Sequence, residues 1–491
     1  MNKITTAQKT LEYYVLLSGE STPPVPTPTQ VTIDGNFEIE QSGSTYTMSF
    51  SIRNFDWSSL ESGWTGTVVY GQNTLTFDST NLNNNTITIS VSESQIDLTA
   101  TTATMEITSG TEEYEGTSNV EVGFVDYMFV ENTYNGTNTL TLTTTTAGSP
   151  TTDYSTTVQY SKDRTNWTTV TFDTSTPYNI SMNQGEKVYF RNNNGKFNCC
   201  NTIETVYYST IITGSKTHKT GGDIRSLLDY TNIQSSGPGC FYRLFYNDTN
   251  LVSSSELTLP PTVGFASLAQ IFMGCTSLAT VSAIPATTTL SERCYAQMFY
   301  GCSSLVTAPA LPATTLARNC YDNMFRGCSS LVSTPNLPAT VMYKQCYNSM
   351  FRECSSLTSV SSLPATVLED GCYGNMFMDC TSLTSVPSDL LPATNLQYAR
   401  VYYQMFRGCT NLVKAPVLPA TTLTSNCYYY MFYGCSALNE VTTYADNISA
   451  SNSHTSWLLN VASNGTFHNL GTASWPSGGN GIPTGWTVVT Q

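Results

Sequence analysis

Charged residues are scarce in this sequence of 491 residues. Asp, Glu, Lys and Arg together make up 11% of it, against about 25% in ordinary globular proteins. Thr, Ser, Asn and Tyr take their place, and such a neutral surface is more typical of extracellular or virion proteins than of cytoplasmic enzymes. Acidic residues dominate the few charges, and the formal net charge is −15. We expect no nucleic-acid partner, because phosphates repel an acidic chain.

Long apolar runs are also missing. No stretch approaches the roughly 20 apolar residues of a membrane helix, so we expect no membrane insertion. The only apolar run near the N-terminus is shorter than the 7–15 or so residues that a secretory signal needs. A proline-rich segment, TPPVPTPT at 22–29, follows it and favours an extended spacer. We interpret residues 1–29 as an anchor and linker, with a plain tether as the alternative. The candidate assembly anchor consists of Tyr13, Tyr14, Val15, Leu16 and Leu17.

Motifs for catalysis and cofactor binding are missing as well. The three histidines form neither HExxH nor HxH, and no GxGxxG, Walker or GxSxG sequence occurs. Three glutamates at 112, 113 and 115 lie in a hairpin-like turn, where a solvated loop is the simpler interpretation. We therefore expect no enzyme, no catalytic residue, no metal site and no cofactor. A depolymerase would need paired acids in a cleft, which folding can assemble from distant positions.

The first half of the chain reads as short β-strands. Residues 30–125 alternate apolar with hydroxyl side chains in segments such as TYTMSFSI and TITISVS, which turn-rich stretches separate. This pattern predicts a β-sandwich of immunoglobulin type. It would lack the inter-sheet disulfide, because no Cys precedes Cys199. Residues 126–220 repeat the style and predict a second β module.

Tandem repeats dominate from about residue 240. Phe299, Phe325, Phe351, Phe377, Phe406 and Phe432 recur at spacings of 26, 26, 26, 29 and 26 residues. Repeats of this length indicate a solenoid, in which each unit buries its apolar face on its neighbours. We predict a solenoid over 221–446, with a helical N-terminal cap at 221–250, and a C-terminal cap over 447–491.

Each repeat is expected to contain one strand and one helical turn. In the strand, inward side chains would alternate at Leu305, Thr307, Pro309 and Leu311. In the turn, apolar types recur at i, i+1, i+4, i+5 and i+8, which fits one face of a helix. These residues are Cys294, Tyr295, Met298, Phe299 and Cys302. The fold class is thus multidomain, with all-β modules followed by an α/β leucine-rich-repeat solenoid.

Thirteen of the 15 cysteines belong to the repeats, in two equivalent slots per unit. One of these slots holds Val401 instead. Valine can replace a buried thiol but not a disulfide partner or a metal ligand, so buried reduced thiols are favoured over disulfides and metal. The remaining pair, Cys199 and Cys200, gives only a weak hint of zinc.

Outward slots of the predicted helical turn vary between repeats. Tyr and Arg are enriched at binding hot spots, and stacking would align equivalent slots in a stripe. An ordinary solvated face is the alternative. The candidate receptor-binding residues are Tyr300, Arg326, Arg352, Tyr403, Arg407, Tyr429, Tyr430 and Tyr433.

The repeats resemble those of BspA-type leucine-rich-repeat proteins over about residues 240–445. The shared elements are C-S-S-L, L-P-A-T-T-L and M-F-x-G-C, and the ending from Gly481 is similar to a closing strand of that group. The resemblance implies surface adhesins of gut Bacteroidales, or fibres of the tailed, crAss-like phages that infect them. Adhesins of this group carry an export signal that we do not find here, and reduced thiols suit assembly in a host cytoplasm.

We therefore expect a virion structural protein of a tailed phage, such as a head or tail fibre. Its N-terminal part would attach to other virion proteins of the capsid or tail, and its repeats would bind a host surface protein or glycan. Fibres are usually oligomeric, so a homo-oligomer is expected. The alternative is a bacterial cell-surface adhesin.

Overall fold

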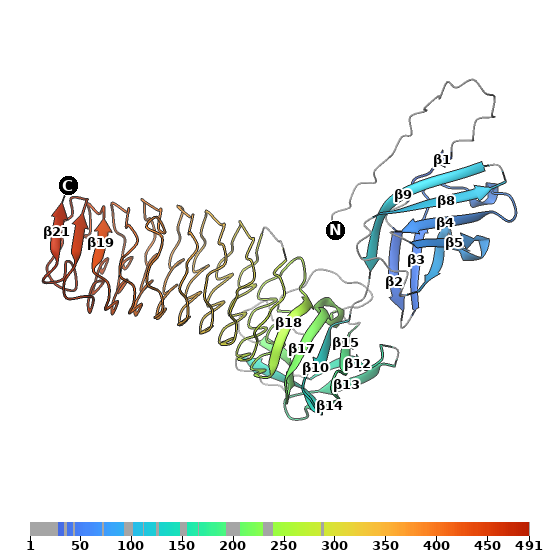
Figure 1. The fold of residues 1–491 in the computed structure, drawn as a ribbon, viewed down its shortest axis with the longest axis horizontal. Helices are drawn as coiled ribbons and strands as arrows, with labels where there is room; N and C mark the ends of the chain where they lie inside the picture. Colours follow the sequence, from blue (N-terminus) through green and yellow to red (C-terminus); the bar gives the residue numbers. More distant parts are fainter. Residues whose placement is uncertain are drawn as a thin grey trace, which may run out of the picture. The chain divides into compact units, whose positions relative to one another are not determined.

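The chain divides into two compact units, Met1–Asp126 and Tyr127–Gln491, each described here by itself (Figure 1). The computed structural model describes residues 28–33, 37–42, 45–70, 73–92, 102–110, 112–123, 127–147, 155–164, 166–192, 207–228, 239–285 and 289–490. Over these ranges the regular elements are β-strands and short 3-10 helices. No helix within them is both long and apolar enough to cross a membrane.

The first unit is all β, as predicted. Its strands run in the order β5-β4-β8-β9-β2-β3-β7-β6, with β1 beside β9. The strands are β1 (Thr29–Gln30), β2 (Phe37–Ser42), β3 (Thr45–Ser51), β4 (Thr65–Tyr70), β5 (Asn73–Asp78), β6 (Leu82–Asn83), β7 (Thr86–Val91), β8 (Thr102–Ser109) and β9 (Glu112–Gly123), with 3-10 turns η1 (Trp57–Ser59) and η2 (Ser79–Asn81).

The long strand β9 joins two halves of this unit. Its first part pairs antiparallel with β8, and its last residues pair parallel with β2. The halves meet through a shared core, in which the rings of Phe50 from β3 and Phe77 from β5 lie 5.4 Å apart. Buried and exposed residues alternate along β4 and β7. The predicted alternation is confirmed there, because successive strand side chains point to opposite faces.

The second unit begins with two sheets, ordered β13-β12-β15-β10-β17-β18 and β14-β11-β16. Their strands are β10 (Phe129–Asn132), β11 (Asn138–Ala147), β12 (Thr156–Ser161), β13 (Thr168–Phe172), β14 (Tyr178–Met182), β15 (Lys187–Arg191), β16 (Tyr207–Gly214), β17 (His218–Asp223) and β18 (Leu251–Thr258). A single hydrophobic core runs from these sheets into the repeats.

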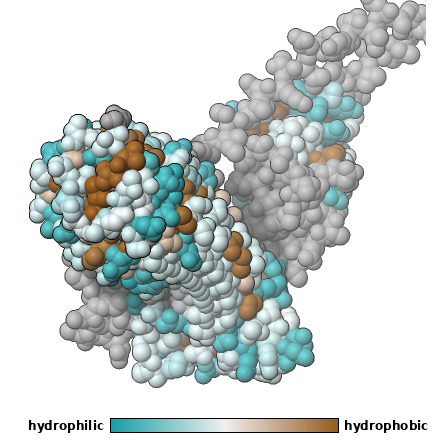
Figure 2. Space-filling view, turned by 60° about the vertical axis from the view of Figure 1, so that its left-hand side comes forward, coloured by the Kyte–Doolittle hydropathy of each residue, from teal (hydrophilic) through white to brown (hydrophobic). Residues whose placement is uncertain are grey.

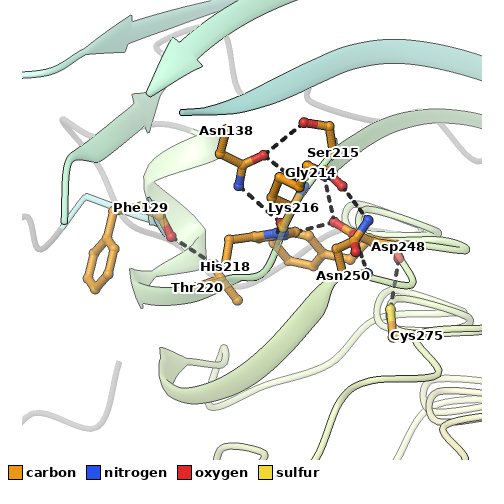
Figure 3. Close-up of polar contacts among 11 residues, drawn as sticks. Phe129, Asn138, Gly214, Ser215, Lys216, His218, Thr220, Asp248, Asn250 and Cys275 are labelled. Carbon is orange, nitrogen blue, oxygen red and sulfur yellow. Dashed lines mark hydrogen bonds and ion pairs between the residues drawn. The ribbon is translucent and has the colours of Figure 1, made fainter. Parts of the chain in front are cut away.

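The β module and the repeats are joined at β18. This strand lies parallel to β17, and on its other side Ser253 bridges to Thr280 of the next coil. A buried contact between His218 and Asp248 lies at the same junction (Figure 3). Nε2 of His218 lies 2.8 Å from Oδ2 of Asp248, and both side chains are at most 1% exposed. The backbone N–H groups of Gly214 and Asn250 donate to the same carboxylate at 3.1 Å.

Repeat coils stack in a row between β18 and the C-terminus (Figure 1), but the predicted helices are wrong. In the part of each coil that was expected to be helical, backbone hydrogen bonds alternate between partners in the same coil and partners in the next coil. Met298 N–H donates to the Tyr295 carbonyl at 3.2 Å, whereas Phe299 N–H donates to Met324 of the next coil at 2.9 Å. Every fourth residue has a positive φ, as at Arg293 (56°), Gln297 (57°) and Gly301 (75°). We call this segment of each coil, such as residues 293–301, the turn ribbon.

The expected helical cap at 221–250 contains no α-helix in its described parts, 221–228 and 239–250. Residues 221–228 complete β17 and form the 3-10 turn η4 (Ile224–Leu227). Residues 239–247 are already a turn ribbon, with positive φ at Gly239, Arg243 and Asn247. The first coil therefore starts directly against the β module.

The predicted strand of each repeat is also corrected. Thr307 is exposed and Pro309 is half-buried, so side chains do not alternate inward there. Buried residues instead recur every third position, as at Leu331, Thr334 and Leu337. The backbone forms only isolated parallel bridges between coils, such as Thr307 with Ser333, because the segment is too irregular for a continuous ladder.

Stacked aromatic rows fill the core of the repeats. Consecutive Phe rings from Phe245 to Phe432 lie 5.5–5.8 Å apart. A second row holds the tyrosines Tyr295, Tyr321, Tyr347, Tyr373, Tyr402 and Tyr428, and Trp457 stacks on its end at 5.8 Å.

The last coils end in a parallel sheet of β19 (Glu440–Thr443), β20 (Thr466–Asn469) and β21 (Thr487–Thr490). Apolar residues gather at this end of the array (Figure 2). Leu459, Val488 and Val489 are 39–46% exposed there.

Candidate binding face on the repeat array

The candidate receptor residues all lie on the turn ribbon, where coil stacking aligns them in columns. One column directly follows the buried Met-Phe pair of each coil, and another lies two residues before the pair; Tyr430 lies between, directly before Met431. All eight side chains are half-buried, so each keeps a surface that a partner can contact. Their positive-φ neighbours turn the backbone sharply, which directs these side chains away from the core.

Four tyrosines from two adjacent coils form one cluster, which we call the tyrosine cluster. Tyr403 and Tyr429 stack at 5.2 Å with an interplanar angle of 2°. Tyr430 meets Tyr429 edge-on at 4.4 Å and Tyr433 at 5.0 Å. The sequence expectation that stacking brings these residues together is therefore met.

Arg407 completes this cluster. Its guanidinium lies 5.7 Å from the ring centre of Tyr430 and 5.3 Å from that of Tyr433. Such cation–π contacts hold the side chain over the rings, and its Nη1 donates to Oε1 of Gln404 at 2.9 Å. Partial burial, followed by a hydrogen bond with Tyr430, raises the pKa of Tyr429. The cluster offers aromatic faces, phenol hydroxyls and one cation.

The other three candidates form a separate group in earlier coils. Arg326 lies 5.2 Å from the ring centre of Tyr300 and 3.2 Å from the Glu353 carboxylate. Arg352 contacts the same carboxylate at 3.0 Å. Buried Met378 occupies the equivalent position between Arg352 and Arg407, so this group is not continuous with the tyrosine cluster.

The structure also has a cavity on the turn ribbons of the first coils, which the sequence analysis did not predict. It measures about 300 Å³ and is lined by Tyr242, Ala266, Ala269, Gln270, Arg293, Ala296, Gln297, Asn319 and Asp322. We call it the alanine cavity. Its signal in the sequence is Ala269 and Ala296, which occupy the slot that holds Tyr403 and Tyr429 in later coils.

The other residues that the sequence analysis considered form no catalytic or metal site in the described part of the chain. Glu112 and Glu113 are exposed, and Glu112 accepts a hydrogen bond from the Tyr114 hydroxyl. In the described part of the chain, no three His, Cys, Asp or Glu side chains gather as metal ligands would. The candidate anchor at Tyr13–Leu17 and the pair Cys199 and Cys200 lie outside the described residues.

Comparison with known proteins supports the repeat assignment. Residues 269–413 and 373–456 match the family model described as BspA type leucine rich repeat region, in six copies. Neither the curated proteins nor the solved structures include a significant match to the chain. The repeat region is therefore BspA-like, and the preceding β modules are described by their structure alone.

Proposed function

We propose that this chain is a non-enzymatic adhesive protein, which uses the turn ribbon of its BspA-like repeats to bind a host surface protein or glycan. The observation that carries this proposal is the tyrosine cluster. Tyr presents a large rigid ring with a polar tip at little cost in conformational entropy, and Arg407 adds a hot-spot cation. Repeats of this type are typical of surface adhesins.

Two structures are candidates for the carrier of the repeats, meaning the particle or cell on which they are displayed. The first is the virion of a tailed phage, where the chain would be a head or tail fibre assembled with capsid or tail proteins. Thirteen free cysteines favour this carrier, because disulfides are rare where the host cytoplasm keeps thiols reduced. The second is a bacterial surface, which the adhesin-type repeats support equally.

The parts outside the repeats have supporting roles in this proposal. The immunoglobulin-like module at 30–125 and the second β module at 126–220 are spacers, and residues 1–29 are the anchor and linker. The assembled fibre is a homo-oligomer. If residues 1–20 form the anchor, their deletion should abolish incorporation into particles while the repeats still fold; unchanged incorporation would contradict this role.

The adhesive role is tested with the variant Tyr429→Ala, Tyr430→Asn, Tyr433→Ala. Asn is chosen at position 430 because φ is 52° there and Asn tolerates this conformation. We expect binding to host cells to fall at least tenfold, since hot-spot truncations each cost about 2 kcal/mol or more. Tyr343→Ala and Tyr398→Ala serve as controls, because these tyrosines are 44% and 43% exposed outside the cluster. A folded triple variant that binds as well as the controls would exclude the cluster.

The carrier is tested separately by mass spectrometry. The chain should be recovered from purified virions at a copy number typical of an appendage if it is a fibre. Recovery from bacterial surface fractions free of virions would contradict the phage carrier and support the adhesin.

A further inference from the structure

The alanine cavity is a hollow built by four consecutive coils. Tyr242, Ala269, Ala296 and Asp322 occupy the same slot in successive coils. The Tyr242 ring is 6% exposed and packs on Ala266 and Ala269. Because the two alanines end at Cβ, the space that Tyr rings fill in the later coils stays open. The hollow therefore has an apolar floor between a tyrosine wall and a carboxylate.

Two residues that line the hollow, Asn319 and Asp322, each have one side-chain oxygen without a hydrogen bond in the described structure. Asn319 is only 9% exposed, and its Oδ1 makes no hydrogen bond within the described structure. A buried amide oxygen without a hydrogen bond is unfavourable, and a ligand hydroxyl would relieve this once the Asn319 side chain turns toward the hollow. Asp322 accepts from Asn323 and Asn348, both at 2.9 Å and both on Oδ1. Its Oδ2 is the oxygen left for a ligand.

The charges around the cavity are nearly balanced. Arg293 lines it, with Nε 3.9 Å from Glu292, a distance that leaves the guanidinium able to donate elsewhere. Arg318 approaches the same glutamate at 3.7 Å. Burial raises the pKa of Asp322, although the bonds from Asn348 and Asn323 act against it. Among the residues that line the cavity, Arg293 and Asp322 are the two with opposite charges, so neither an anion nor a cation meets a charge of one sign alone.

We propose that the alanine cavity is a subsite for one neutral monosaccharide unit. Sugar hydroxyls can donate to Asn319 and Asp322 and accept from Arg293, and the C–H face of the ring can lie on Ala269 and Ala296. The volume is at the lower end of the range for small-ligand pockets, about 300–1,000 Å³. A purely apolar ligand would leave the Asn319 oxygen unpaired. This proposal goes beyond the proposed function, because the cavity and the tyrosine cluster are separate sites that bind independently.

Saturation-transfer NMR and calorimetry on the full chain test the proposal. The probes are glucose, galactose, mannose and N-acetylglucosamine, with glucuronate and glucosamine as charged comparisons. We expect millimolar affinity for at least one neutral sugar, as suits a single small ligand. Failure of all four neutral probes to bind, or tighter binding of a charged probe, would overturn the assignment.

Two variants locate the binding site. Ala296→Tyr should abolish sugar binding by filling the hollow, and Tyr is already accommodated in this slot at Tyr403 and Tyr429. Asn319→Gly should weaken binding about tenfold by removing one buried acceptor. Gly371 holds the equivalent position with φ 63°, so the backbone should tolerate this change even if Ala296→Tyr does not fold.

The tyrosine-cluster variant is the matched control. It should bind sugar as the unmodified chain does, whatever it does to host-cell binding. Sugar binding that persists in both cavity variants would show that the ligand sits elsewhere and would refute the proposal, without bearing on the tyrosine cluster.

Discussion

At the scale of single residues, the repeat cysteines act as small buried donors. The thiols of Cys302, Cys328 and Cys354 each lie 3.1–3.2 Å from the carbonyl of a Phe in the preceding coil. The Sγ atom thus fills a core position and ties neighbouring coils together. All thirteen described cysteines are free and buried, which agrees with the expectation of buried thiols.

The cysteine position directly before the buried tyrosine of each coil should tolerate an apolar replacement. Val401 occupies it in one coil and is fully buried. We expect Cys346→Val to change the free energy of unfolding by about 1 kcal/mol or less, since the volumes are similar. Cys346→Asp should lower it by roughly 4 kcal/mol, because it places a carboxylate in an apolar core.

Urea denaturation followed by circular dichroism measures both variants against the unmodified chain. Within the described structure, the Cys346 thiol donates only to Met342 Sδ, at 3.5 Å, and we expect this weak contact to contribute little. A loss for Cys346→Val as large as that for Cys346→Asp would contradict this expectation.

The array thiols should also be chemically inert in the folded protein. Burial raises the pKa of Cys320 and Cys372 to about 12, so at pH 8 both remain thiols. Alkylating reagents attack the thiolate. We expect iodoacetamide at pH 8 to leave these two cysteines unmodified in native protein and to modify them fully in urea.

Peptide mapping by mass spectrometry reads out this experiment residue by residue. Labelling of array peptides in the native state, at a rate near that in urea, would contradict the buried positions. Cys199 and Cys200 lie outside the described residues, so their labelling does not affect the result.

At the scale of the element, the turn ribbon depends on one left-handed residue in every four. The residue directly before the cysteine that follows each Met-Phe pair is glycine in several coils, with φ of 75° at Gly301 and Gly327. Gly adopts this conformation without strain, whereas other L-residues lose about 1–2 kcal/mol. The ribbon is therefore encoded by residues that tolerate positive φ as much as by its apolar side chains.

Substitution of Gly301 tests this requirement. A Cβ there would lie 3.8 Å from Gly274, an ordinary contact, so only the backbone conformation is strained. We expect Gly301→Ala to lower the free energy of unfolding by about 1 kcal/mol. Gly301→Asn should cost less, because Asn enters the left-handed region more readily.

Thermal unfolding of the two variants compares them directly. If Asn destabilises the protein as much as Ala does, the cost arises from side-chain bulk, and the conformational explanation fails.

At the scale of the whole molecule, the two units have separate hydrophobic cores. The first core lies within residues 33–107. The second runs without interruption from the β sheets at Met128 to Trp486. Because residues that share a core tend to unfold together, the β module beside the repeats should not melt separately from the first coils.

We therefore expect two main unfolding transitions. Phe50→Ala, in the first core, and Phe190→Ala, in the second, each remove a buried ring and should cost about 3–5 kcal/mol. Each variant should shift only the transition of its own unit. Differential scanning calorimetry follows the transitions, and hydrogen exchange assigns them. A shift of both transitions by either variant would indicate coupled units.

Several features of this protein were determined by the sequence alone. The repeat period, the buried rows of Phe and Cys, and the equivalence of Val401 to a thiol all follow from residues that recur at a constant spacing. The strands of the first unit follow from period-two alternation. These patterns are local, so they can be recognised without knowing what the segments contact.

The backbone path of the repeats was decided only in the tertiary structure. Apolar residues at i, i+1, i+4, i+5 and i+8 fit a helix of 3.6 residues per turn and also a ribbon that turns every four. Bonds such as that of Phe299 N–H to Met324 favour the ribbon, because they exist only when the next coil is present. The alanine cavity has the same origin. Ala269, Ala296 and Asn319 enclose a space only because stacking places consecutive coils side by side.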